Sequence, residues 1–140
     1  MPELPEVETT VKSLNILKNK KVISLDIHSK KLRYSVPHLE LKKIINHKII
    51  KLRRIAKYVI VDFEESISVI IHLGMSGRLK IVKVNKSIKK HDHLVFNFNN
   101  IKLIYNDPRR FGFFKIFLSK KNFLIILVNM DLNRLIKSLI

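Results

Sequence analysis

Short apolar runs rich in Val, Ile, Tyr and Phe follow one another from residue 21 to residue 117, separated by polar residues or glycine. Runs of this length and composition are typical of β-strands. The segments that fit are 22–28, 47–55, 57–63, 68–73, 78–84, 93–98, 101–105 and 111–117. Eight short strands at this spacing predict a β-sandwich or a β-barrel.

A helix is predicted over residues 5–18. Pro5 suits a first helical turn, because the amide hydrogen that it lacks would have no partner there. Apolar residues recur every three or four positions, as on one buried face of a helix: Leu4, Val7, Val11, Leu14 and Leu17. The first turn is acidic and Lys12 lies later, which is the order that the helix dipole favours.

Three other segments carry local signals. Residues 37–45, where Leu and Ile alternate with Lys, predict a short helix. Asn99-Asn100 predicts a two-residue hairpin and is compatible with positive φ. Residues 122–140 are apolar at helical spacing and contain neither Gly nor Pro, so they can form a closing helix.

The charge of the chain favours a polyanionic partner. Lys and Arg number 28 against 11 Asp and Glu, which gives a net charge of +17. Nucleic acid is the first candidate partner and an anionic membrane surface is the second. The absence of cysteine excludes disulfides, thiolate catalysis and Cys-ligated zinc within these residues. The N-terminus is acidic, unlike a signal peptide, and no apolar stretch approaches the ~20 residues of a membrane span, so we expect a cytoplasmic protein.

The N-terminal stretch MPELPE can carry nucleophilic chemistry. Removal of Met1 would leave Pro2 with a secondary α-amine, whose ordinary pKa of about 7.7–8.0 keeps much of it neutral near pH 7. Such an amine can attack an aldehyde carbon, such as C1′ of a deoxyribose, and form an iminium. Glu3 could then donate or shuttle a proton. A simple extension before the helix is the alternative interpretation.

Two turns carry residues suited to DNA. In HLGMSG, residues 72–77, two glycines mark a tight turn with Met75 at its tip, where a flexible apolar side chain can wedge into a base stack. In NDPRRFG, residues 106–112, two guanidinium groups suit phosphates and base edges, and a phenyl ring can stack. An ordinary hairpin, and a surface turn with a buried Phe, are the alternatives.

Two weaker signals remain. Lys57, following Arg53-Arg54, adds a cation, or else lies on a solvated strand edge. His91-Asp92-His93 contains metal-ligating residue types, but without a fourth ligand nearby it does not predict a metal site.

Five stretches in the same order resemble the bacterial formamidopyrimidine-DNA glycosylases, which are bifunctional base-excision repair enzymes that remove oxidised purines. They are MPELPEVETT (1–10), AKY (56–58), IHLGMSG (71–77), KHDH (90–93) and DPRRFG (107–112). The resemblance implies an α+β, mainly β fold: an eight-stranded β-sandwich with an N-terminal helix over residues 1–117. Residues 118–140 would be a divergent apolar tail.

The resemblance also implies a role for each matching residue. Pro2 would be the nucleophile that displaces the damaged base and holds the sugar as a Schiff base. Glu3 would be its acid–base partner, Glu6 would support the site, and Lys57 would contact a phosphate and donate a proton during β-elimination. The DNA-contacting positions would be His91 and Arg109, and the gap left by an extruded nucleotide would be filled by Met75, Arg109 and Phe111.

The resemblance ends near residue 117, whereas family members are about twice as long. Their second domain carries a helix-two-turn-helix element and a four-Cys zinc finger, and neither is present in these residues. We therefore expect no metal or other cofactor. We also expect weak abasic-site lyase activity at most, on double-stranded DNA with oxidised purines or abasic sites, and no membrane partner. The alternatives are a non-catalytic DNA-binding remnant of a decayed gene and a chain that misfolds. The oligomeric state stays open.

Overall fold

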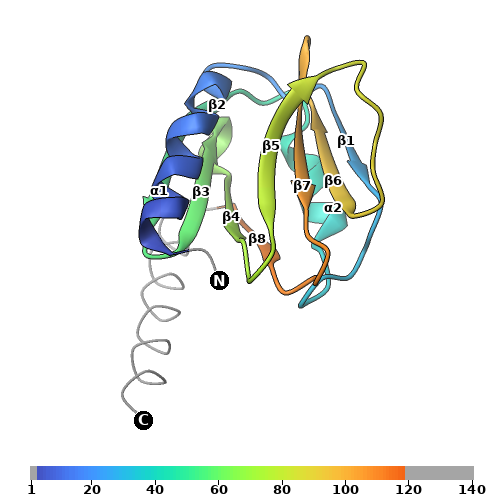
Figure 1. The fold of residues 1–140 in the computed structure, drawn as a ribbon. Coiled ribbons are helices and arrows are strands. Elements are labelled where there is room, and N and C mark those ends of the chain that lie inside the picture. The colour runs from blue at the N-terminus through green and yellow to red at the C-terminus, as the bar shows by residue number, and fades with distance from the viewer. Residues whose placement is uncertain (1–2, 119–140) are drawn as a thin grey trace.

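Two antiparallel four-stranded sheets pack face to face in the computed structural model, which describes residues 3–118 (Figure 1). One sheet has the order β1-β6-β7-β5 and the other β2-β3-β4-β8. The strands are β1 Ser24–Ile27, β2 Ile49–Ile55, β3 Tyr58–Phe63, β4 Ser68–His72, β5 Arg78–Lys83, β6 Asp92–Asn97, β7 Ile101–Asn106 and β8 Phe113–Phe117. The eight predicted strands are confirmed, and they form a sandwich.

Alternation along the strands divides the apolar side chains between the two faces of each sheet. In β3, Val59, Val61 and Phe63 enter the main core between the sheets. Tyr58 and Ile60 point to the opposite face, where a smaller apolar cluster forms. This is the period-2 pattern of a strand buried on both faces. It explains why the sequence of β3 is apolar almost throughout.

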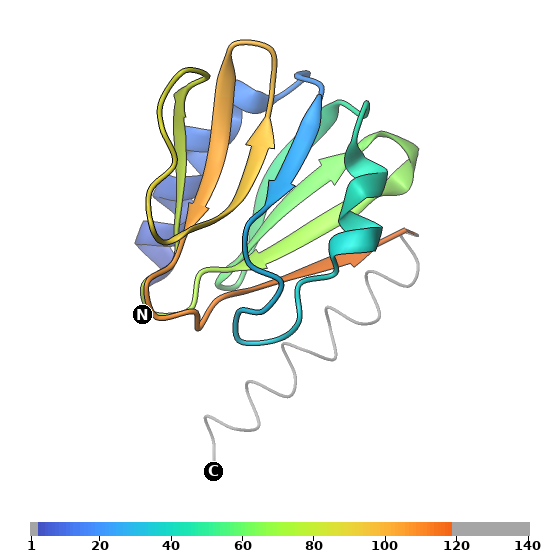
Figure 2. The same cartoon turned by 90° about the vertical axis from the view of Figure 1, so that its right-hand side faces the viewer.

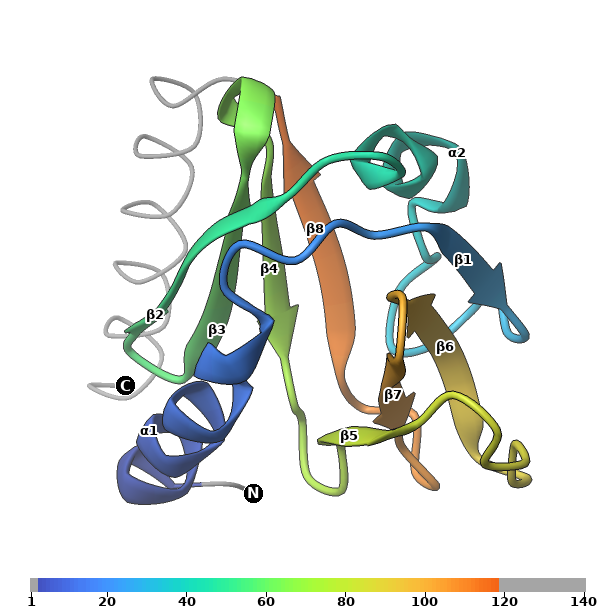
Figure 3. The same cartoon turned by 90° about the horizontal axis from the view of Figure 1, so that it is seen from above.

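The helices lie at the two ends of the sandwich (Figure 3). α1, Leu4–Ser13, continues into the 3₁₀ helix η1, Leu14–Leu17, and packs mainly against β2. α2, His38–Leu41, continues into η2, Lys42–Ile44, at the other end, between β1 and β8. Both helices add buried side chains to the main core, so they close the sandwich.

The predicted helix over residues 5–18 changes character after Ser13. The hydroxyls of Thr9, Thr10 and Ser13 donate to the carbonyls of Pro5, Glu6 and Thr10 at 2.8–2.9 Å. Such side-chain bonds compete with the regular ladder of an α-helix. Directly after Ser13 the chain continues as the 3₁₀ helix η1. Because residues three apart share a face there, Leu14 and Leu17 are both buried.

The predicted hairpin at Asn99-Asn100 is confirmed between β6 and β7, where the Phe98 N–H donates to the Ile101 carbonyl at 2.9 Å. Neither asparagine has a positive φ, although the sequence was compatible with it. Among the residues with positive φ are Ala56, Gly74 and Arg110. These residues lie in the connections β2–β3, β4–β5 and β7–β8.

Some predictions fall outside the described residues. They concern Met1, Pro2 and the tail, whose predicted closing helix covers residues 122–140. The proposed division at residue 117 therefore stays a prediction. Within residues 3–118, no helix is long and apolar enough to cross a membrane.

Candidate functional site

The predicted site residues gather at one end of the sandwich. In all three views the start of α1 lies at the same end as the β4–β5 and β7–β8 connections (Figures 1–3). Figure 2 shows this corner at the lower left. The predicted residues that the structure describes there are Glu3, Glu6, Lys57, Met75, His91, Arg109 and Phe111. Pro2 lies outside the described residues, but it is bonded directly to Glu3.

Glu3 and Lys57 are brought together from α1 and the β2–β3 turn. Glu3 is the N-cap of α1, and its carbonyl accepts the Val7 N–H at 3.0 Å. Its Oε2 lies 3.7 Å from Nζ of Lys57. The Glu3 side chain is 67% exposed and that of Lys57 is 26% exposed. A carboxylate and an ammonium group therefore lie side by side. The carboxylate belongs to the residue that directly follows the predicted nucleophile, Pro2.

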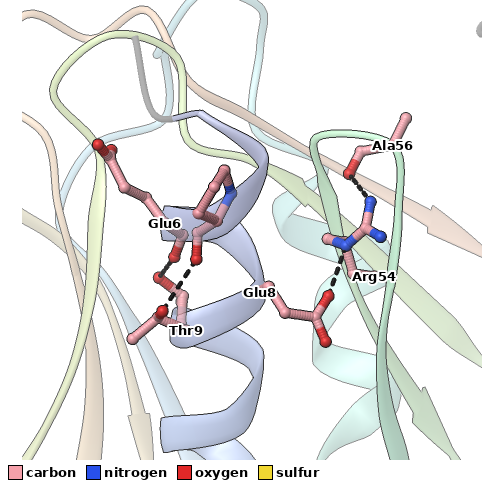
Figure 4. A network of polar contacts seen from close by, with 7 residues as sticks. Glu6, Glu8, Thr9, Arg54 and Ala56 are labelled. Atoms are coloured by element: carbon pink, nitrogen blue, oxygen red, sulfur yellow. Dashed lines mark hydrogen bonds and ion pairs between the residues drawn. The ribbon is translucent and has the colours of Figure 1, made fainter.

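Glu6 lies in the first turn of α1 and is exposed. Its side chain points away from that of Glu8, which faces β2 (Figure 4). Its carbonyl accepts the Thr10 hydroxyl at 2.9 Å. The structure places Glu6 near the start of the helix, as expected, and its supporting role stays a prediction.

The wedge loops are the β4–β5 connection, residues 73–77, and the β7–β8 connection, residues 107–112. They touch through their backbones. Gly74 has φ +63°, and a Cβ there would lie 2.5 Å from the Gly112 nitrogen and the Phe111 carbonyl carbon. Glycine is therefore required for this approach. Met75 and Phe111 are 47% and 41% exposed, and the Arg109 guanidinium carbon lies 5.2 Å from the centroid of the Phe111 ring.

The carboxylate of Asp107 joins the wedge loops from inside. It is fully buried, and its Oδ1 accepts the Ser76 hydroxyl at 2.6 Å and the Arg110 N–H at 3.1 Å. Its Oδ2 accepts the Tyr105 hydroxyl at 2.7 Å and the Gly112 N–H at 2.9 Å. Four donors of this kind satisfy a buried carboxylate without a cation. The Asp107 side chain therefore fixes the loops that present the wedge residues.

Two further features tighten this junction. The Ser76 hydroxyl accepts the Arg109 N–H at 3.1 Å, so the residue after Met75 binds the backbone of another wedge residue directly. Burial, the hydrogen bond to Asp107 and the charge of Asp107 all raise the pKa of Tyr105 above its ordinary value. The phenol therefore stays protonated and remains a donor near neutral pH.

His91 lines a basic hollow of about 390 Å³ beside the wedge loops. Its lining includes His28, Ser29, Lys89, Lys90 and Arg110. The His91 carbonyl accepts the Asp107 N–H at 3.1 Å, which ties His91 to the same junction. Cationic and polar groups around a concave surface are suited to a phosphate oxygen.

The neighbours of His91 have structural partners. The Asp92 carboxylate accepts the Lys89 N–H and the Asn106 side-chain amide, each at 2.7 Å. Nε2 of His93 donates to the Asp107 carbonyl at 2.8 Å. Over residues 3–118, no cluster of three or more His, Cys, Asp or Glu is placed to hold a metal ion.

Sequence reasoning assigned no role to Asp107, Tyr105, Ser76, Glu8 or Arg54. For Asp107 a partial signal exists, since Asp before Pro often begins a turn and accepts a nearby N–H. That signal covers the bond from Arg110 but not those from Ser76 and Tyr105. The Arg54 Nε donates to Glu8 at 2.6 Å across 46 positions of sequence, and no local signal reports such a contact.

Comparison with known proteins identifies the family of the chain. The family model for the formamidopyrimidine-DNA glycosylase N-terminal domain matches residues 1–114. The chain belongs to the formamidopyrimidine-DNA glycosylase family. It is 46% identical over 131 residues to the formamidopyrimidine-DNA glycosylase of Rickettsia canadensis, covering 89% of this chain and 45% of that protein. For the Rickettsia bellii protein the identity is 50% over 120 residues, covering 80% and 42%.

Solved structures of the family share the fold. Fpg (MutM) of Lactococcus lactis, in complex with FAPY-dG-containing DNA, superposes with a TM-score of 0.84 at 30% identity, over 91% of this chain and 48% of that one. The complex of the same protein with abasic-site DNA gives a TM-score of 0.83 at 30% identity, over 91% and 47%. The chain thus spans about half the length of the solved structures and less than half of the curated relatives above.

Proposed function

We propose that this protein acts in DNA repair, on double-stranded DNA that carries a damaged or abasic site, with abasic-site lyase chemistry at the amine of Pro2. Oxidised purines are the proposed lesions. The ion pair between Glu3 and Lys57, one residue from Pro2 and beside the wedge loops, is the observation that carries the proposal. The names of the relatives and the DNA-bound structures of the family support it.

The proposed reaction runs through a covalent sugar intermediate. The lone pair of the Pro2 nitrogen attacks C1′ of the ring-opened abasic sugar, and water leaves to give an iminium ion. A base then removes a proton from C2′, and the C3′–O bond breaks, so that the 3′ phosphate leaves with the electron pair. Water hydrolyses the unsaturated iminium and restores the amine. Side chains and water supply every group that these steps use.

Glu3 and Lys57 carry out different proton transfers in this scheme. The exposed carboxylate of Glu3 can reach an incoming sugar and accept or return a proton. The ammonium group of Lys57 can bind the departing phosphate and donate a proton to it. Their separation of 3.7 Å lets one sugar-phosphate unit contact both groups.

Recognition of the damaged position falls to the wedge residues. Met75 and Phe111 are large apolar side chains held out from the surface by the fixed wedge loops. Inserted into a duplex, they would fill the space beside an abasic sugar, with Arg109 against the bases. The basic hollow at His91 would bind the backbone phosphates. An abasic sugar suits this arrangement because no base has to be extruded.

Borohydride trapping tests the proposal directly. The untagged 140-residue chain, with removal of Met1 verified by mass, is incubated with a duplex bearing one abasic site and then reduced. Proteolysis and mass spectrometry locate the adduct. We expect it on the N-terminal peptide, with a rate that Pro2→Gly and Glu3→Gln each lower about tenfold or more.

The location of the adduct decides between interpretations. The chain has many lysines, so an adduct spread over lysine peptides would contradict the proposal. DNA binding without any adduct, from chain with a free Pro2, would also contradict it and leave a non-catalytic DNA-binding protein. Leu39→Ala serves as the control variant, because this side chain is 65% exposed on α2 at the opposite end of the sandwich.

A further inference from the structure

Arg54 of β2 connects two elements of the site through one guanidinium group. Its Nε donates to Oε2 of Glu8 on α1 at 2.6 Å, and its Nη1 donates to the carbonyl of Ala56 at 2.9 Å (Figure 4). We call this three-residue contact the Arg54 bridge. Glu8 lies on α1, whose N-cap is Glu3, and Ala56 directly precedes Lys57. The two bonds therefore link the helix that carries Glu3 to the turn that carries Lys57.

The bond to Ala56 fixes the peptide from which Lys57 begins. The Ala56 carbonyl belongs to the planar unit that includes the Lys57 nitrogen, so holding the oxygen orients the start of Lys57. Ala56 has φ +51°, a left-handed conformation that alanine rarely adopts. An unsupported turn of this kind would relax readily. Arg54 donates its hydrogen bond to the carbonyl of Ala56, the residue with this strained backbone.

The packing of α1 does not depend on the Arg54 bridge. Val7 and Val11 of α1, and Leu14 and Leu17 of the 3₁₀ helix η1 that continues it, are buried in the main core and hold the helix against the sandwich. The Glu8 side chain is 44% exposed and that of Arg54 is 32% exposed. Ion pairs as exposed as this contribute little to folding. The contact is therefore better suited to alignment than to stability.

We propose that Arg54 is a positioning residue that sets the alignment of Lys57 with Glu3 for the lyase reaction. The inference rests on the proposed function and deepens it. Arg54 touches neither of these groups in the described contacts, and it acts through Glu8 and the Ala56 carbonyl. Its planar fork reaches two acceptors at once, which the single ammonium group of a lysine cannot reproduce.

The neighbouring residue provides a matched control. Arg53 lies on the other face of β2, and its Nε donates to Oδ2 of Asp62 on β3 at 2.7 Å. Its side chain is 29% exposed, close to the value for Arg54. Arg53→Lys thus makes the same chemical change, in the same strand, at an ion pair that does not contact α1 in the described structure.

Single-turnover trapping at saturating abasic-site DNA compares the parent with four variants. They are Arg54→Lys, Glu8→Gln, the double variant of these two, and Arg53→Lys. We expect Arg54→Lys to lower the trapping rate about tenfold, because displacing a catalytic group by a fraction of an ångström has effects of this order. The dissociation constant for DNA and the melting temperature should stay close to those of the parent. The double variant should be no slower than Arg54→Lys, since both changes break one bridge. Arg53→Lys should react like the parent.

A second readout does not depend on lyase activity. The acylation rate of each lysine by an amine-reactive reagent is measured by mass spectrometry in the same variants. We expect Arg54→Lys to raise the rate at Lys57 at least about threefold, because the ammonium loses its alignment with Glu3, while Lys115 reacts unchanged. This result would hold even if the parent forms no adduct at Pro2. Failure of the proposed lyase function can therefore be told apart from failure of the positioning role of Arg54.

Two outcomes would overturn the inference. One is an Arg54→Lys variant that traps DNA and acylates at Lys57 as the parent does. The other is a parallel loss of melting temperature and rate in both arginine variants, since this would mean that the bridge acts only through folding.

Discussion

The bond between Tyr105 and Asp107 allows the buried junction of the wedge loops to be tested by the loss of one oxygen atom. Tyr105→Phe removes the donor that lies 2.7 Å from Oδ2 and leaves that oxygen with the Gly112 N–H. Both side chains are fully buried, so no water replaces the lost donor. A buried hydrogen bond to a charged group contributes about 1.5–3 kcal/mol. We expect the free energy of unfolding to fall by about 2 kcal/mol.

Urea titration at pH 7 measures this change from the transition midpoint at constant slope. Thermal melting should show a drop of about 5–10 °C for a domain of this size. The control is Tyr34→Phe, because Tyr34 is 52% exposed and its ring packs on Phe113 by an edge contact that the change preserves. Its free energy of unfolding should change by no more than about 0.5 kcal/mol.

The effect of Tyr105→Phe also depends on pH with a definite sign. The pKa of Tyr105 is raised in the folded protein, so above about pH 10 the unfolded chain loses this proton while the folded chain keeps it. Stability of the parent then falls by about 1.4 kcal/mol per pH unit from this group alone. The variant lacks that loss, so the difference between the two should shrink above pH 10. A difference below about 0.5 kcal/mol at pH 7, or one that grows above pH 10, would refute the reasoning.

Three other outcomes follow from the same geometry. Gly74→Ala should lower the free energy of unfolding by about 3 kcal/mol or more in urea titration, because its Cβ would lie 2.5 Å from backbone atoms in a left-handed residue; an unchanged midpoint would contradict this. Met75→Ala combined with Phe111→Ala should lower the preference for abasic over intact duplex about tenfold in competition binding, with stability within about 1 kcal/mol; equal loss on both duplexes would argue against a wedge. Raising salt from about 50 to 200 mM should weaken binding to intact duplex at least about tenfold in anisotropy titrations, given the net charge of +17; a flat salt response would exclude phosphate contacts as the main source of affinity.

The strands were predictable because their signal is local. Each apolar run is long enough to indicate a strand by itself, and several of the connections contain Gly or Asn, as in 73–77, 99–100 and 107–112. The change from α-helix to 3₁₀ helix at Leu14 was not predictable in the same way. The 3₁₀ turn goes with the burial of Leu14 and Leu17 in the core, which is a tertiary contact. Periodicity alone continues the helix through residue 18.

For the site, the sequence predicted individual residues but not the contacts between them. Motif resemblance named Glu3, Lys57 and the wedge residues, but it carried no information on what holds them. Ser76 and Asp107 are 31 positions apart, and Glu8 and Arg54 are 46 apart. Contacts over such separations exist only after the sheets have paired, so they follow from the register of β2, β4 and β7 and not from any local pattern.

The Asp107 contacts and the Arg54 bridge hold the site in different ways. This difference decides whether the effect of each on the site can be measured apart from its effect on folding. Asp107 is buried, so removing its partners changes stability and loop geometry together. Arg54 is partly exposed and helps to hold a helix that the core already anchors, so its loss can change alignment with little effect on stability. The Arg54 bridge is therefore the better place to ask whether chemistry at Pro2 requires aligned partners. The bond between Tyr105 and Asp107 is the better place to ask whether the wedge must be rigid.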